Sequence, residues 1–387
     1  MEMPDTDLSF LVHRGSRSRR SIENFLAYMR SSYPSWRIGA AVRLPRESSS
    51  YQEDAAVAFA AHADYVLADP ETRLMHLPFD KRGKGRRDYR YLAEPDPLVN
   101  RQRFTERVLE AQIRNAREVL ISPWLIHNLS GTTRELTATS AFAALADASS
   151  ARNGRKLLLG FEATEDIIAD TSTRNLFLNE LVETPTHPVY LRMTTGTTAG
   201  PSQYAHEAAL IGLRRVTESL AENERDLVLP QSGLCGWLMQ GFGAIAFGAG
   251  VQFSMQRAQT LRTTGGGGGG SAPLHWYFWP QFLGFVLAEE LAQLTAVSGA
   301  QACGCPFCQG SPPVGGAAFD REAAELHFLW WCAHLADEVR SASNRAQEIR
   351  GRVAGAVSHW GAVQAAGVSL DNRSRPQHLA IWSRVVA

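Results

Sequence analysis

Residues 156–161 read KLLLGF; a helical pattern over residues 173–182 and a second apolar run, VYLRM at 189–193, follow them. Both runs are almost uniformly apolar, which indicates strands that are buried on both faces, as in a parallel sheet covered by helices. An apolar run, a helical pattern and a second apolar run in this order are typical of a βαβ unit. This stretch therefore predicts an α/β fold with a parallel sheet.

The same alternation extends along the chain in both directions. Other runs predicted as strands lie at residues 38–44, 65–68, 119–122, 226–229, 244–247 and 274–279. Other helical patterns lie at residues 100–116, 140–151 and 204–221. Eight such units in about 260 residues predict a (β/α)8 TIM-type barrel. An open doubly wound sheet is the alternative, although no Gly-x-Gly-x-x-Gly turn follows the first predicted strand.

These patterns divide the 387 residues into three parts. We expect residues 1–35 to form an N-terminal extension, residues 36–294 the barrel, and residues 295–387 an appended C-terminal zinc-binding helical subdomain. Two segments interrupt the barrel pattern. Residues 70–98 form a basic insertion, and residues 258–273 contain six consecutive glycines. Because such a run has no side chains to pack, it predicts a loop or linker, whether natural or engineered.

The composition is that of a folded protein, with 44% hydrophobic residues and 39 basic residues balancing 39 acidic ones. A net charge of zero argues against a polycation that coats nucleic acid, but it leaves room for a local basic patch. No run of 18 apolar residues predicts a membrane span. Since the first residues also lack the pattern of a secretory signal, we expect a cytoplasmic protein.

Three of the five cysteines fall within the stretch CGCPFC at residues 303–308. In a cytoplasmic chain this clustering favours a metal site over disulfides. A tetrahedral zinc site needs a fourth ligand, and we expect it to be His334, in the helix predicted over residues 320–352; Cys332 and His327 are alternatives. Three thiolates and one imidazole leave no open position, which predicts structural zinc. Three reduced cysteines in a turn are the other interpretation.

The spacing of Cys303, Cys305 and Cys308, followed by His334, resembles the zinc signature of the tRNA-guanine transglycosylases. That family includes the queuine and archaeosine tRNA-ribosyltransferases and the DNA-acting DpdA branch. Its members are (β/α)8 barrels with a zinc subdomain near the last strands, and they exchange guanine in nucleic acid for a 7-deazaguanine. The resemblance therefore implies a pentosyltransferase that acts on DNA or tRNA.

Base exchange requires one carboxylate to hold the ribose anomeric carbon and a second to move protons. Barrel enzymes place such groups at the C-terminal ends of strands. Asp69 ends the second predicted strand, where the resemblance implies an acid/base aspartate, although Asp-Pro-Glu-Thr stands here for the family's Asp-Ser-Gly-Gly. Glu162 ends the fourth, near the family's base-reading aspartate, with Glu165 and Asp166 as alternatives. The alternative for Asp69 is the start of an ordinary turn, and the alternative for Glu162 is a solvated acidic loop.

Two further groups are candidates for substrate binding. Ser232 and Gly233 resemble the Gly-Gly-Leu segment that lies under the substrate base in the family, and small residues let backbone amides approach a planar ring. Arg192 ends the fifth predicted strand. We expect it to meet a phosphate or a carboxylate of the substrate, or else to form an ordinary salt bridge.

The family's nucleophilic aspartate has no counterpart in this chain, because no Asp or Glu lies between Asp226 and Glu289. One hypothesis is that Asp69 or Glu162 supplies the nucleophile. The alternative is a non-catalytic, zinc-stapled barrel that binds nucleic acid or a catalytic partner subunit. A barrel hydrolase of unrelated chemistry is a third possibility.

Contact with phosphate needs concentrated positive charge, which two segments provide. The insertion contains Lys81, Arg82, Lys84, Arg86, Arg87 and Arg90, and the N-terminal segment contains Arg14, Arg17, Arg19 and Arg20. Tyr89, Tyr91 and the aromatic run at residues 276–279 are candidates for stacking on unpaired bases, or for packing in the interior. We therefore expect DNA or tRNA as a partner, leave a homodimer or partner subunit open, and expect no membrane.

Overall fold

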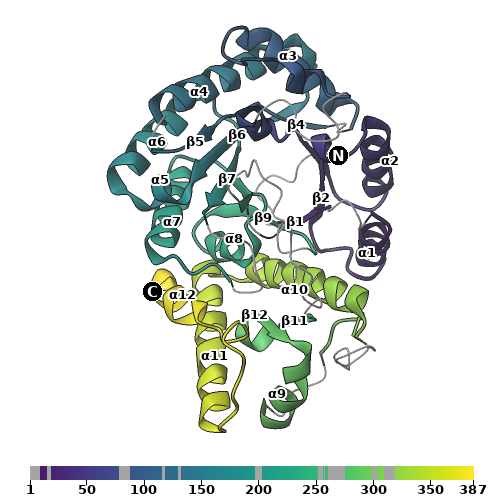
Figure 1. The fold of residues 1–387 in the computed structure, drawn as a ribbon, viewed down its shortest axis with the longest axis vertical. Coiled ribbons are helices and arrows are strands. Elements are labelled where there is room, and N and C mark those ends of the chain that lie inside the picture. Colours follow the sequence, from purple (N-terminus) through teal and green to yellow (C-terminus); the bar gives the residue numbers. More distant parts are fainter. Residues whose placement is uncertain are drawn as a thin grey trace.

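The structure is a computed structural model, and it describes residues 9–14, 19–77, 88–115, 118–129, 132–196, 203–251, 256, 258–259, 275–298, 303–308 and 319–387. Parallel strands form a nearly closed barrel with helices on its outside (Figure 1). The predicted (β/α)8 barrel is thus confirmed. Among the described helices, none is both long and apolar enough to cross a lipid bilayer.

The barrel strands follow one another around the ring in chain order. They are β1 (Ser9–His13), β2 (Ile38–Arg43), β3 (Val66–Asp69), β4 (Val119–Ile121), β6 (Lys156–Thr164), β7 (Val189–Thr195), β8 (Leu227–Leu229) and β9 (Ala244–Ala249). β9 returns to pair with β1, so one ladder runs from β3 through β1 and β9 to β4. Two short strands, β5 (Ile126–His127) and β10 (Ala258–Gln259), pair with β6 and β7.

A threonine side chain closes the seam between β3 and β4, where the described residues form no strand ladder. Thr72 Oγ1 donates a hydrogen bond to the Trp124 carbonyl oxygen at 2.8 Å and accepts one from the Trp124 amide at 2.9 Å. Both residues are fully buried. The side chain therefore satisfies backbone groups that a neighbouring strand would otherwise pair.

Helices cover the outer face of the strands. Those that precede β9 are α1 (Arg19–Ser32), α2 (Ser49–Ala60), α3 (Arg101–Ile113), α4 (Thr132–Ala148), α5 (Glu165–Ala169), α6 (Thr171–Glu183), α7 (Glu207–Glu222) and α8 (Gly233–Gln240). Polar caps fix where some of them begin: the side chains of Asn100, Asp170 and His206 each accept the backbone N–H of the residue three positions later.

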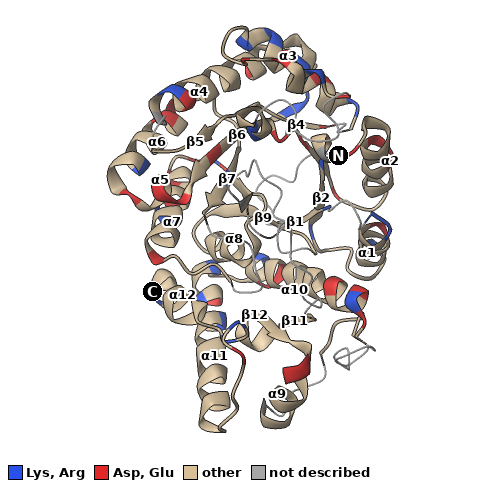
Figure 2. Ribbon diagram, viewed as in Figure 1, with Lys and Arg blue, Asp and Glu red and all other residues tan. Residues whose placement is uncertain are grey.

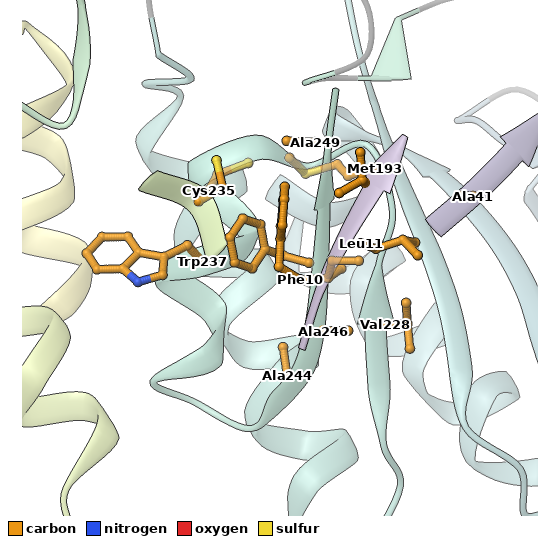
Figure 3. Close-up of a cluster of buried hydrophobic side chains, with 14 of the residues drawn as sticks. Phe10, Leu11, Ala41, Met193, Val228, Cys235, Trp237, Ala244, Ala246 and Ala249 are labelled. Carbon is orange, nitrogen blue, oxygen red and sulfur yellow. The ribbon is translucent and has the colours of Figure 1, made fainter. Parts of the chain in front are cut away.

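Residues 9–32 belong to the barrel, which corrects the expected N-terminal extension. β1 lies between β2 and β9, and the ring of Phe10 packs 5.2 Å from that of Phe247. Figure 3 shows Phe10 directed toward Trp237 on α8, on the opposite side of β1 from Leu11. Phe10 thus faces the helical layer and Leu11 the barrel interior. A run of three apolar residues, at 10–12, is too short to reveal its period.

The run at residues 274–279, predicted as the eighth barrel strand, lies outside the barrel. Within it, β11 (Trp276–Trp279) pairs antiparallel with β12 (Gly284–Leu287) and forms a hairpin. The remaining helices are α9 (Leu291–Ser298), α10 (Arg321–Ser341), α11 (Arg345–Ala365) and α12 (His378–Val386). The single helix predicted over residues 320–352 is therefore two helices, and Asn344 caps the second.

Helix α10 covers the barrel wall after β9, the eighth barrel strand. It packs against β1, α1 and α8, and the Trp237 indole N–H on α8 donates a hydrogen bond to the Leu335 carbonyl at 3.3 Å. On its other side α10 contacts the hairpin strand β11 (Figure 1). The cysteine and histidine cluster near the C-terminus fits the expected zinc-binding subdomain, and α10, which belongs to it, also completes the wall of the barrel.

Candidate active site and metal centre

Five polar residues face the barrel interior near the C-terminal ends of its strands, and we call them the polar layer. They are His13, Arg43, Asp69, Glu162 and Arg192. The strand register pairs Arg43 with Asp69 and Glu162 with Arg192, so each pair points to the same face of the sheet. Most charged residues lie on the outer helices and loops (Figure 2), whereas four of these five are fully buried. The layer lies where barrel enzymes carry their chemistry.

Asp69 is held on both of its carboxylate oxygens. Oδ1 accepts the Glu71 amide at 2.9 Å, while Oδ2 accepts the Tyr190 hydroxyl at 3.0 Å and the guanidinium of Arg192. Glu71 has a left-handed φ of 43°, which makes the turn after β3 tight. Burial, and then the charge of Asp69, raise the pKa of Tyr190 well above its usual value. Asp69 thus both organises the turn and presents a carboxylate to the layer.

Glu162 is buried and surrounded by hydrogen-bond donors from other strands and loops. It accepts the Trp124 indole N–H at 3.0 Å and the Thr194 hydroxyl. Arg73 lies 3.0 Å from Oε1, and Arg192 lies 3.6 Å from Oε2. The solvated acidic loop is therefore the wrong interpretation of Glu162.

Arg192 forms salt bridges with both candidate carboxylates, those of Asp69 and Glu162, as one of its two interpretations predicted. Burial disfavours its charge, but Asp69 and Glu162 more than offset this, and the pKa of the guanidinium lies above its ordinary value. Its Nε and Nη1 donate no hydrogen bond to any described residue. Because Arg43 pairs with Glu71 and Arg73 with Glu162, the buried guanidinium groups balance the buried carboxylates.

His13, like Arg43, is a residue of this layer that was not predicted from the sequence. It ends β1 and is fully buried, and its Nε2 accepts the Gln231 backbone amide at 3.3 Å. Burial lowers its pKa well below the usual value, and the charge of Arg192 lowers it further. A histidine directly after a short apolar run was the available signal, but it lay in the segment expected to be an extension.

The segment after β8 is close to the layer, and Ser232 and Gly233 lie within it. Ser232 borders a small cavity together with Tyr204 and Cys235. Gly233 has φ +54°, and a Cβ there would come 2.9 Å from the backbone oxygen of Gln256. The glycine is therefore required for the approach of another backbone segment, whichever ligand binds nearby.

The alternative acidic residues have structural positions. Glu165 accepts the Gly196 amide and the Tyr204 hydroxyl, both at 2.6 Å, and so ties the end of β7 to the following segment. Asp166 is exposed on α5, outside the polar layer. Asp69 and Glu162, rather than these two residues, are the carboxylates that the structure brings together.

The structure describes only some of the residues that were expected to contact nucleic acid. Lys81, Arg82, Lys84, Arg86, Arg87, Arg17 and the six glycines lie outside the described residues. Tyr89 and Tyr91 are buried, with their ring centroids 6.1 Å apart, so they pack in the interior instead of offering faces to bases. Arg14 is also buried and donates to Gln52 at 2.7 Å. Arg20 and Arg90 are exposed, and Arg19 is half-buried.

The cysteine turn forms a second site, below α10. Ligand atoms of Cys303, Cys305, Cys308 and His327 all lie within 4.8 Å of one another, and the group could hold a metal ion. The distances from His327 Nδ1 to the three sulfur atoms are 3.4, 3.2 and 3.1 Å. Tetrahedral zinc bonds of about 2.3 Å to sulfur and about 2.0 Å to nitrogen would give sulfur–nitrogen distances of about 3.5 Å, so the four atoms fit such an ion.

His327 takes the place that was expected for His334. Its Nε2 lies 2.8 Å from the Phe278 carbonyl oxygen and donates a hydrogen bond to it, which leaves the Nδ1 lone pair facing the sulfur atoms. His334 lies two turns further along α10, where it stacks on Trp330 and pairs with Glu338 at 3.2 Å. Helix periodicity does not distinguish the two, because both lie on one face of α10.

Neighbouring groups support thiolate ligands. The Cys305 amide points at Cys303 Sγ and the Cys308 amide at Cys305 Sγ, each at 3.4 Å. The Tyr277 hydroxyl lies 3.2 Å from Cys308 Sγ, and its ring stacks on His327. Hydrogen bonds from the other two thiols lower the pKa of Cys303, whereas the neighbouring thiols raise the pKa values of Cys305 and Cys308, so a bound cation is needed to ionise all three. Tyr277 and Trp279 are buried here, so the aromatic run packs against the metal centre.

Comparison with known proteins leaves the two sites to be interpreted from their geometry. No protein-family model matches the sequence, and no curated protein matches it significantly.

Proposed function

We propose that this chain is a transglycosylase-like enzyme that exchanges guanine for a 7-deazaguanine base in DNA or tRNA. The observation that supports this most is the meeting of Asp69 and Glu162, from β3 and β6, on the guanidinium of Arg192. Two carboxylates at the C-terminal end of a parallel barrel are the minimum that base exchange requires.

In the proposed reaction a carboxylate oxygen attacks C1′ of the nucleoside as the bond from C1′ to N9 of guanine breaks. The electron pair of that bond leaves with guanine, which takes up a proton. The incoming base then loses its N9 proton and attacks C1′ through N9, which releases the carboxylate. One C–N bond replaces another, no proton is consumed overall, and two inversions retain the configuration at C1′.

Asp69 is our choice for the nucleophile and Glu162 for the group that moves protons. Among the described residues, Asp69 pairs with one guanidinium group, from Arg192, whereas Glu162 pairs with those of Arg73 and Arg192. Attack on C1′ takes a carboxylate out of its ion pairs, and Asp69 has fewer of them to give up. Asp69 therefore retains more reactivity.

The metal that we assign to the cysteine cluster is zinc. Three thiolates and one imidazole suit zinc, and a site that such ligands fill leaves no position for substrate. The ion would therefore stabilise the junction between the hairpin and α10 without taking part in the exchange.

Base exchange is the direct test. Purified protein would be incubated with labelled guanine and, separately, with DNA and with tRNA. We expect incorporation into one polymer, a loss of at least about 100-fold in Asp69→Asn and Glu162→Gln, and normal activity in the control Asp54→Asn, which changes an exposed carboxylate on α2. Thermal unfolding would establish that each variant folds. Failure of the folded wild type to label either polymer, or full activity in Asp69→Asn, would contradict the proposal.

A non-catalytic barrel that binds nucleic acid or a catalytic partner subunit is the second candidate. Strand β9 contains no acidic residue, and both carboxylates of the polar layer are buried in ion pairs. Phosphate contacts would come from exposed arginines such as Arg20 and Arg90 and from the basic insertion. Tight, salt-dependent binding of nucleic acid without turnover, or copurification with a catalytic paralogue, would favour this candidate.

A further inference from the structure

The imidazole of His13 fills the space that a side chain on the last barrel strand would occupy. Gly248 on β9 pairs with Leu11 on β1, and Leu11 faces the barrel interior. A Cβ on Gly248 would lie 2.5 Å from His13 Nε2 and 2.7 Å from Cδ2. At Gly248, β9 therefore contributes only backbone to the barrel interior. The imidazole of His13, from β1, occupies the space beside it.

The hydrogen bond from Gln231 defines which nitrogen of His13 carries the proton. Because Nε2 accepts the Gln231 amide at 3.3 Å, a neutral ring must carry its proton on Nδ1. In an imidazole ring, Nδ1 lies opposite the Nε2–Cδ2 edge, and that edge faces Gly248. Nδ1 therefore points away from β9, and it has no hydrogen-bond partner among the described residues.

Three donors in the layer thus have no hydrogen-bond acceptor among the described residues: His13 Nδ1, and Nε and Nη1 of Arg192. A buried donor without a partner costs free energy unless a ligand or water supplies an acceptor. The guanidinium groups of the layer are already balanced by Asp69, Glu71 and Glu162. An added anion would upset that balance, so a neutral acceptor fits better.

We propose that His13 is a substrate-binding residue whose Nδ1–H, with the guanidinium of Arg192, binds a neutral carbonyl oxygen of the ring-lactam type, such as O6 of a guanine or 7-deazaguanine base. This inference rests on the proposed function, and it assigns the recognition of the base to β1, a strand outside the predicted site. Gly248 is then required because any side chain would displace the ring.

Calorimetric titration of the full chain with guanine tests the inference. We expect His13→Ala to weaken binding about 10-fold, as the loss of one buried hydrogen bond implies. Asn places an amide near the position of Nδ1, so His13→Asn should recover most of the affinity. Gly248→Ala should weaken binding like His13→Ala, because the new methyl group pushes on the ring. Its control is Gly355→Ala on α11, where a Cβ meets no atom within 4 Å.

Nitrogen NMR of histidine-labelled wild-type protein gives a readout that does not depend on any variant. We expect a neutral His13 with its proton on Nδ1, and a shift of the Nδ1 signal when guanine is added. A proton on Nε2, or equal guanine affinity in wild type and folded His13→Ala, would overturn the inference while leaving the proposed function intact. If the wild type neither binds guanine nor exchanges it, the proposed function itself fails, and this inference fails with it.

Discussion

His127 shows how a single buried group connects the fold to pH. It lies on β5, fully buried against the rings of Phe161 and Phe177, and neither ring nitrogen has a hydrogen-bond partner among the described residues. Burial, reinforced by the neighbouring His76, lowers its pKa to about 3. The folded state therefore holds it neutral at a pH where the unfolded chain, with a histidine pKa of about 6.5, binds a proton.

Replacing His127 with Phe should make the free energy of unfolding less dependent on pH under acidic conditions. Since the folded pKa is depressed, the wild type loses stability as the pH falls below about 6.5, by about 1.4 kcal/mol per pH unit for this one histidine. His127→Phe cannot bind that proton. Between pH 7 and pH 5, its free energy of unfolding should therefore rise by about 2 kcal/mol relative to that of the wild type. Urea unfolding at both pH values measures this. Parallel curves for the two proteins would show that His127 is protonated in the fold.

At the same scale, the sequence identifies some site residues and not others. Asp69, Glu162 and Arg192 could be predicted because each lies at the end of a clear apolar run. His13 could not, because its strand is short, and His327 could not be separated from His334 by spacing on one helix. The pairing of Asp69 with Arg192 depends on barrel closure, which brings together side chains that no local pattern relates.

At the scale of elements, the contact between β3 and β4 is the weakest part of the ring, because Thr72 replaces a ladder there. Thr72→Val keeps the shape of the side chain but leaves the Trp124 amide and carbonyl unsatisfied in the interior. We expect the free energy of unfolding to fall by about 2–4 kcal/mol. Urea unfolding measures the change.

Thr217→Val is the matched control for the seam. Thr217 is also fully buried, but its hydroxyl only donates to the Leu213 carbonyl within α7, which remains part of the helix after substitution. We expect a loss below about 1.5 kcal/mol. Equal effects of the two substitutions would mean that Thr72 does not hold the seam.

Element boundaries were predictable where an apolar run ends at a turn, and not where tertiary contacts decide. The runs at 156–161 and 189–193 correspond to β6 and β7, each extended by two or three residues beside its neighbours. The aromatic run at 274–279 has the composition of a buried strand, but its partner is β12, four residues away along the chain. Composition alone cannot tell a barrel strand from a hairpin strand that is buried by a helix.

At the scale of the whole molecule, the metal centre joins the helix that closes the ring to the segment that precedes it in the chain. His327 belongs to α10, while the three cysteines and Tyr277 precede that helix in the chain. α10 in turn packs on β1 and α8. A bound ion therefore connects the hairpin and the cysteine turn to the barrel wall through this one helix.

Loss of the metal should accordingly loosen one side of the barrel first. We expect His327→Ala to lose its zinc and several kcal/mol of unfolding free energy, since metal binding contributes directly to folding. His334→Ala, on the same face of the same helix, should keep one zinc per chain. Hydrogen exchange should then show faster exchange in α10, β1 and the hairpin of His327→Ala, with α4 and α6 on the far side of the ring unchanged (Figure 1). Elemental analysis measures the zinc. Zinc loss in His334→Ala alone, or uniform exchange around the ring, would show that His327 does not connect the ion to the barrel.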